Sequence, residues 1–185
     1  MRHSCTHAPP IVCSAETAMR DYDLSGANTR DLLTLFSRVM KQLRERKVVR
    51  SGNNPVGDYC ESLVVRALKL RQLERSNKGC DAVDESGKTK YEIKGRRITE
   101  DNPSTQLSVI RDLDSCNFHY LVGVLLDEDF KVFYGCCIPH EVVKDFAPQR
   151  DYVNGRIIHL SPSLRKDPRV RDITLELTKA QNEWI

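Results

Sequence analysis

Apolar residues recur with a helical period in the first third of the chain. From Asn28 onwards they are spaced three and four residues apart, which predicts an amphipathic helix with Asp31 in its first turn. The apolar positions of this helix are Leu32, Phe36, Val39, Met40 and Leu43. A second amphipathic helix is predicted over 55–73, because Asn54 and Pro55 are typical of a helix start and the apolar residues after them keep the same period.

The pattern changes after Gly79, where short segments alternate between apolar and polar residues. Residues 80–84 and 89–94 are predicted to form a β-hairpin with Ser86 and Gly87 at its tip. The elements predicted after the hairpin are a loop and short helix over 102–113, strands over 119–126 and 130–138, a helix over 140–146 and a short strand over 157–160. The order of these helices and strands along the chain predicts an α/β fold with a central mixed sheet of about four to five strands flanked by helices.

Three segments differ in organisation. Residues 1–27 mix Pro, Ser and His without periodicity and are predicted to be a flexible arm. Residues 28–160 are predicted to form one domain, with its chemistry concentrated in 55–138. The remaining residues, 161–185, are predicted to be a charged tail.

Composition narrows the class of protein. The 185 residues carry a formal net charge of +3 and include no long apolar run, so we expect neither a transmembrane helix nor a secretory leader. The seven cysteines form no CxxC motif, which favours reduced thiols and a cytoplasmic location over a disulfide framework or a zinc site. A nucleotide cofactor is not expected, because there is neither a P-loop nor a GxGxxG motif.

The predicted hairpin contains the candidate chemistry. Asp81 lies at the start of its first strand, and Glu92 and Lys94 lie on the second, where alternation places them on one face. Folding over the turn brings the two carboxylates to the same end of the hairpin. Close carboxylates repel each other unless a cation joins them, and oxygen ligands of this kind suit Mg²⁺.

With Glu61 on the preceding helix, these residues resemble the motif of the PD-(D/E)xK nuclease superfamily, which has the restriction-endonuclease-like fold. The resemblance implies that Asp81, Glu92 and the backbone carbonyl of Ile93 hold a divalent metal ion. It also implies that Glu61 holds a second ion, directly or through water. Lys94 would orient or deprotonate the attacking water and stabilise charge on the phosphate.

The implied activity is that of a Mg²⁺-dependent DNA endonuclease of restriction, defence or repair type, with Mn²⁺ as a substitute metal. A homodimer is expected, since one site per chain cuts one strand. Basic residues near the motif or in the first helix are expected to contact DNA phosphates. These residues are Lys47, Lys90, Arg96 and Arg97.

Three alternatives stay open from the residues alone. Asp84 is a second possible ligand, although an Asp in this place also suits the start of the turn. The chain could also be a non-catalytic nucleic-acid-binding or protein-interaction module on the same fold, or an unrelated α/β domain.

Overall fold

A computed structural model describes residues 23–74, 79–150, 152 and 154–184. The chain divides into two compact units between Arg38 and Val39. Helix α1 (Thr29–Glu45) begins as predicted, because the Asn28 side chain accepts a hydrogen bond of 3.0 Å from the backbone N–H of Asp31. Most of the predicted arm lies outside the described residues. Within the described ranges, no helix is both long and apolar enough to span a membrane.

The larger unit is built on a six-stranded sheet in which only β3 and β4 pair in parallel. In spatial order its strands are β1 (Arg71–Gln72), β2 (Ala82–Val83), β3 (Lys90–Arg97), β4 (Tyr120–Leu126), β5 (Val132–Pro139) and β8 (Arg171–Asp172). A separate two-stranded ribbon joins β6 (Gln149–Arg150) to β7 (Gly155–Arg156). The α/β class and the mixed sheet are therefore confirmed, with one strand more than the largest number predicted.

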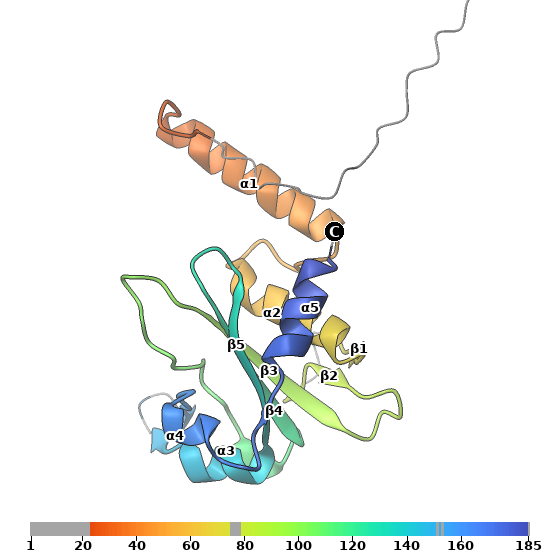
Figure 1. The fold of residues 1–185 in the computed structure, drawn as a ribbon. Helices are drawn as coiled ribbons and strands as arrows, with labels where there is room; N and C mark the ends of the chain where they lie inside the picture. The colour runs from red at the N-terminus through yellow and green to blue at the C-terminus, as the bar shows by residue number, and fades with distance from the viewer. Residues whose placement is uncertain (1–22, 75–78, 151, 153, 185) are drawn as a thin grey trace, which may run out of the picture. The chain divides into compact units, whose positions relative to one another are not determined.

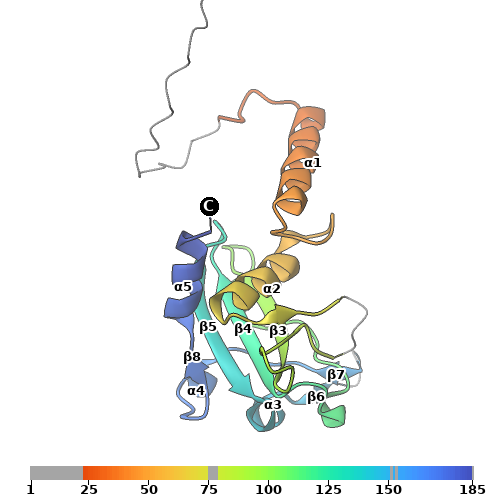
Figure 2. The same ribbon diagram turned by 90° about the vertical axis from the view of Figure 1, so that its right-hand side faces the viewer.

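Helices α2 (Pro55–Ala67) and α5 (Thr174–Asn182) cover one face of the sheet (Figures 1 and 2). Their apolar side chains share a core with alternate residues of the central strands, including Ile93 and Val122. Gly95 lets α2 approach β3 closely, because a Cβ at this position would lie 2.8 Å from the Cβ of Cys60. This approach fixes α2 against the strand that carries Glu92 and Lys94.

The other face packs against α3 (His140–Phe146), α4 (Pro162–Arg165), a 3₁₀ turn (Leu113–Ser115) and the loop before it. The prediction of a strand over 157–160 is wrong. This segment is buried and extended, but it contacts the loop before the 3₁₀ turn only through separate hydrogen bonds, such as Leu107 N–H to the Ile158 carbonyl at 3.0 Å.

The second helix is six residues shorter than predicted. Lys69 adopts a left-handed conformation with φ of 53°, and the N–H of Leu70 bonds back to the Val65 carbonyl at 2.9 Å, which ends the helix. The chain then turns into β1, which pairs with β2. The last residues of the predicted helix thus form β1 instead, which pairs with the hairpin.

Residues after 160 are not a tail. Strand β8 pairs with β5, and Ile173, just before α5, is buried in the core together with Leu177 and Ala180 of α5. Most charged residues of this segment precede α5, and the two within it, Glu176 and Lys179, are exposed, so composition hid the three apolar positions that matter.

Candidate active site

Asp81 lies immediately before β2, on the hairpin that the sequence predicted. Its backbone N–H donates to the Tyr91 carbonyl at 2.8 Å, and its Oδ2 accepts a hydrogen bond of 2.7 Å from the backbone N–H of Ile93. Two bonds therefore fix both the backbone and the carboxylate of Asp81 against the middle of β3.

Glu92 and Lys94 point to the face of β3 opposite to Ile93, as alternation predicted. Lys94 Nζ lies 2.7 Å from Glu92 Oε1, and only about 15% of each side chain is exposed. The ion pair is thus largely shielded from water, which strengthens it relative to a surface pair. Lys94 and Glu92 are held together beside Asp81.

Glu61 reaches the same region from α2. Its carboxylate forms an ion pair with Arg50, and Gln72 Nε2 of β1 lies 3.5 Å from its Oε2. The Arg50 guanidinium also donates to the Leu73 carbonyl at 3.0 Å. Sequence reasoning identified Glu61 but missed Arg50 as its partner, because the loop that carries Arg50 is placed only by tertiary contacts.

Those contacts centre on Asp58, the only buried charged residue among those described. Asp58 Oδ2 accepts hydrogen bonds from the backbone N–H groups of Arg50 and Ser51 at 2.9 and 2.8 Å, and from the Ser51 hydroxyl at 2.8 Å. A buried carboxylate with three donors is a strong local anchor. Asp58 therefore positions Arg50 beside Glu61.

Electrostatics show that the carboxylates act on one another. Burial is the main cause that raises the pKa of Asp81 from 3.8 to about 7, and the negative charge of Glu92 adds to it. The Ile93 N–H opposes the rise, whereas the Glu61 charge adds to it and the Lys94 charge lowers the pKa. Since Glu92 and Glu61 each have a cationic partner, Asp81 is the carboxylate of the group whose charge is least compensated.

The donor types around Asp81 fit a hard divalent cation. Carboxylate oxygens come from Asp81 and Glu92, and the Ile93 carbonyl points to the same side of β3 as its N–H, toward Asp81. However, no group of three or more His, Cys, Asp or Glu suited to hold a metal occurs in the part of the chain that the structure describes. The residues therefore fit Mg²⁺ only as a site with few protein ligands, completed by water and substrate.

The predicted phosphate contacts separate into two groups. Lys90 and Arg96 share the face of β3 that carries Glu92 and Lys94. Arg96 donates to Asn102 Oδ1 at 2.6 Å, but its buried Nε has no hydrogen-bond partner among the described residues. Arg96 lies one strand repeat beyond Lys94 on this face.

Arg97 and Lys47 lie elsewhere. Arg97 projects to the opposite face of β3, where its Nε donates to the Glu128 carbonyl at 3.0 Å and its guanidinium covers the Phe130 ring. Lys47 lines a shallow groove along α2 together with Arg66 and Lys69. Neither residue is brought to the carboxylate group, so a direct role at the site is not supported for them.

Asp84 is engaged in the turn rather than beside Asp81. Its carboxylate accepts hydrogen bonds from Ser86 Oγ, from the N–H groups of Lys88 and Thr89, and from Thr89 Oγ1. These bonds lower the pKa of Asp84 and fix the hairpin tip. The turn interpretation is therefore the one that the structure favours.

Comparison with known proteins adds no assignment, since no family model and no curated protein matches this chain.

Proposed function

We propose that this chain is a metal-dependent phosphodiesterase that cleaves DNA with a site of the PD-(D/E)xK kind. The single observation that carries the proposal is the meeting of Asp81, Glu92 and Lys94 at one point of the hairpin, where the least compensated carboxylate has a pKa near 7. A partly buried group of carboxylates with an adjacent amine is unfavourable without a cation and suits phosphoryl chemistry with one.

Each side chain has a distinct role in this proposal. Asp81 and Glu92, with the Ile93 carbonyl, would hold Mg²⁺, which when bound acidifies a water molecule and offsets phosphate charge. Once Glu92 is engaged, the Lys94 ammonium is available to hold the attacking water and the negative charge that develops on the phosphate. Arg96 would add positive charge beside a neighbouring phosphate.

The direct test is incubation of the purified chain with plasmid, linear duplex and single-stranded DNA, with Mg²⁺ or with EDTA. We expect cleavage in Mg²⁺, none in EDTA, and none by Glu92→Gln in either. Glu85→Gln is the matched control, because Glu85 lies exposed on the tip of the same hairpin. Metal-independent cleavage, or full activity of Glu92→Gln, would refute the proposal.

A second candidate, a DNA-binding module that does not cleave, is favoured by two specific observations. Glu61 and Glu92 are both ion-paired, and the described residues include no three-ligand metal group. Under this alternative, the chain retains DNA in a salt-dependent manner on an electrophoretic mobility assay, but no metal ion produces nicking. Binding that is unchanged by Asp81→Asn would distinguish it from the nuclease.

A further inference from the structure

Helix α1 exposes an apolar stripe. The side chains of Leu33, Phe36 and Val39 are 63%, 53% and 46% exposed, and Leu32 and Leu35 are about 40% exposed. Of the 17 residues of α1, only Met40 is buried. A stripe of this size is rarely left in contact with water by a soluble protein, so it marks an interaction surface.

The spacing of the stripe indicates what the surface binds. Leu32, Phe36, Val39 and Leu43 follow one another at intervals of four, three and four residues, which is the a/d pattern of a helix that packs against another helix. We call these four residues the seam. The positions on both sides of the seam are uncharged: Leu33, Leu35, Met40 and Gln42. All charged residues of α1 lie on the outer side, so a second α1 can approach without bringing like charges together.

The distribution of charge along α1 favours one relative orientation of the two paired helices. Residues 29–37 contain Arg30 and Asp31 and are neutral as a whole, whereas 38–47 contain five basic residues and one acidic residue. Parallel pairing would place the two basic ends side by side. Antiparallel pairing places each basic end beside the neutral end of the partner, with Asp31 close to it, and also opposes the helix dipoles favourably.

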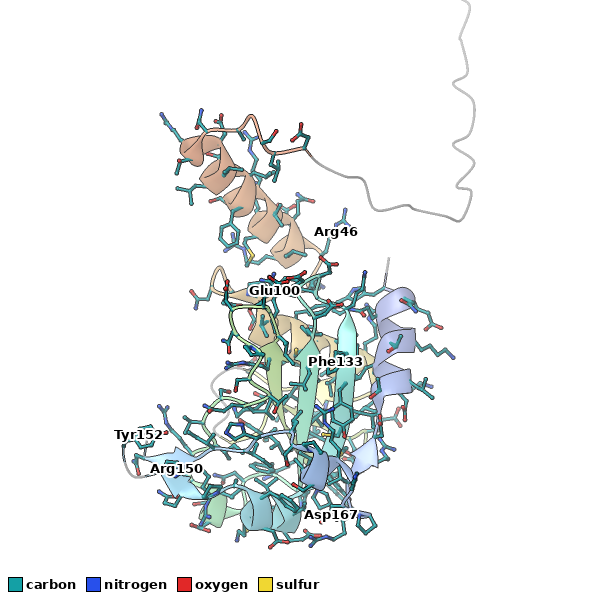
Figure 3. All side chains as sticks on the ribbon, turned by 60° about the vertical axis from the view of Figure 1, so that its left-hand side comes forward. Arg46, Glu100, Phe133, Arg150, Tyr152 and Asp167 are labelled. Carbon is teal, nitrogen blue, oxygen red and sulfur yellow. The ribbon has the colours of Figure 1, made fainter. Side chains whose placement is uncertain are left out.

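Leu43, which belongs to the larger unit, lines a groove of that unit. The groove has a volume of about 680 Å³ and is open to solvent, and Arg46, labelled in Figure 3, is one of the residues that line it. Its lining residues are Leu43, Arg46, Val48, Tyr59, Gln181 and Trp184. In an antiparallel pair centred between Ser37 and Arg38, Leu32 of the second copy falls opposite Leu43, so the beginning of that copy's α1 would enter this groove.

From these observations we propose that α1 is a dimerisation helix, which pairs antiparallel with α1 of a second copy of this chain and fills the groove beside Leu43 and Trp184. The contact is isologous, because both copies use the same surface: the seam of each copy packs against the seam and the groove of the other. An isologous contact of this kind produces a dimer and no larger assembly. The proposal does not depend on the proposed nuclease activity.

The test is the mass in solution, measured by sedimentation at micromolar concentrations. We expect twice the chain mass of 21.2 kDa for the full chain. Phe36→Glu should weaken the dimer by about 100-fold or more, since it places a charge at the centre of the seam. Thr34→Glu, on the outer side of α1, is the matched control and should leave the dimer unchanged.

Two further measurements address orientation and the groove. In chains with Cys5, Cys13 and Cys116 changed to Ser, an equal mixture of Leu32→Cys and Leu43→Cys chains should form a mixed disulfide under mild oxidation, while either alone should form little. Trp184 is the one tryptophan of the sequence, so its emission should shift when dilution separates the chains.

Three outcomes would overturn the proposal. They are a full chain that remains monomeric at micromolar concentrations, disulfides that form within each single-cysteine variant but not in the mixture, and a monomer that instead binds vesicles with anionic lipids through Phe36. The last result would mean that the stripe faces a lipid surface.

Discussion

Asp81 is a partly buried carboxylate whose pKa differs strongly between the unfolded and the folded protein. In the unfolded chain its pKa is that of an ordinary Asp, 3.8, whereas in the folded protein it is about 7. Folding therefore favours the protonated form, and the folded state loses stability as the pH rises from about 4 to about 7. A fold that keeps such a residue sacrifices stability for the site, which is common where function requires a perturbed group.

Asp81→Asn should consequently stabilise the metal-free protein at pH 8. Asn retains an oxygen that accepts the Ile93 N–H but cannot ionise. The gain in free energy of unfolding should be on the order of 1–4 kcal/mol at pH 8 and near zero at pH 4. Urea titrations of both proteins at the two pH values, in EDTA, measure it.

Added Mg²⁺ provides the complementary measurement for this variant. It should raise the thermal midpoint of the parent protein at pH 8 and leave that of Asp81→Asn unchanged, because ligand binding stabilises only the state that binds it. A variant that is less stable than the parent at pH 8 would mean that the Asp81 charge is compensated in solution.

Under the proposed function, Lys94 should contribute to the rate of cleavage more than to the binding of DNA. Lys94→Ala should lower kcat by about 100-fold or more, with little change in Kd, because charge on the phosphate develops only in the transition state. Lys88→Ala removes the same charge from the exposed tip of the same hairpin and should change neither quantity. Equal losses of rate and binding in Lys94→Ala would instead make Lys94 a phosphate anchor.

At the scale of elements, the site depends on how closely α2 lies against β3. Gly95 faces Cys60 across this contact, and Glu61 follows Cys60 in the same helix. Any side chain at position 95 must push α2 outward, and Glu61 would move with it. The contact between helix and strand is thus part of what brings the helical carboxylate to the hairpin.

Gly95→Ala should therefore destabilise the protein by about 1–3 kcal/mol, the usual effect of overpacking. Gly57→Ala is the control within α2. No atom lies within 4 Å of a Cβ built at this position, so the change should stabilise the helix by about 0.5–1 kcal/mol. Chemical denaturation measures both, and a Gly95→Ala protein as stable as the parent would show that α2 can shift freely.

The local pattern predicted the elements that are long or fixed by turns. The hairpin followed from alternation and from Gly87, whose φ of 72° suits its place in the turn, and β4 and β5 followed from their continuous apolar runs. The C-terminal end of α2 could not be predicted, because Lys69 leaves the helix only where β1 can pair with β2. Within the site, Asp81, Glu92 and Lys94 lie on one hairpin and could be predicted from its local pattern. The position of Arg50 could not, because it depends on tertiary contacts with Asp58 and Glu61.

At the scale of the whole molecule, the end of the chain completes the core. Helix α5 covers the same face of the sheet as α2, and its Gln181 donates to the Phe130 carbonyl at 2.7 Å and to the Tyr59 hydroxyl. The Trp184 ring stacks on Tyr59, with centroids 5.8 Å apart. Residues about 120 positions apart thereby hold α2, the β4–β5 turn and the C-terminal segment together.

Leu177 is the central apolar side chain of this contact. It is fully buried and lies directly over Gly135 of β5, where no side chain competes for the space. Leu177→Ala should lower the free energy of unfolding by about 2–5 kcal/mol, because the cavity it leaves lies between a helix and a sheet that are both fixed by other contacts. Leu175 provides a matched control two residues away, since its side chain is 83% exposed and Leu175→Ala should change stability by no more than about 0.5 kcal/mol.

Thiol labelling would localise the effect of Leu177→Ala to the C-terminal segment. Cys137 lies in the core that α5 covers, and burial raises its pKa to about 11, so it should react slowly with iodoacetamide in the parent protein. Loosening of α5 should accelerate its labelling in Leu177→Ala but not in Leu175→Ala. If both variants were equally stable and Cys137 stayed protected, residues 161–184 would be an appendage, as their composition suggested, rather than part of the folded unit.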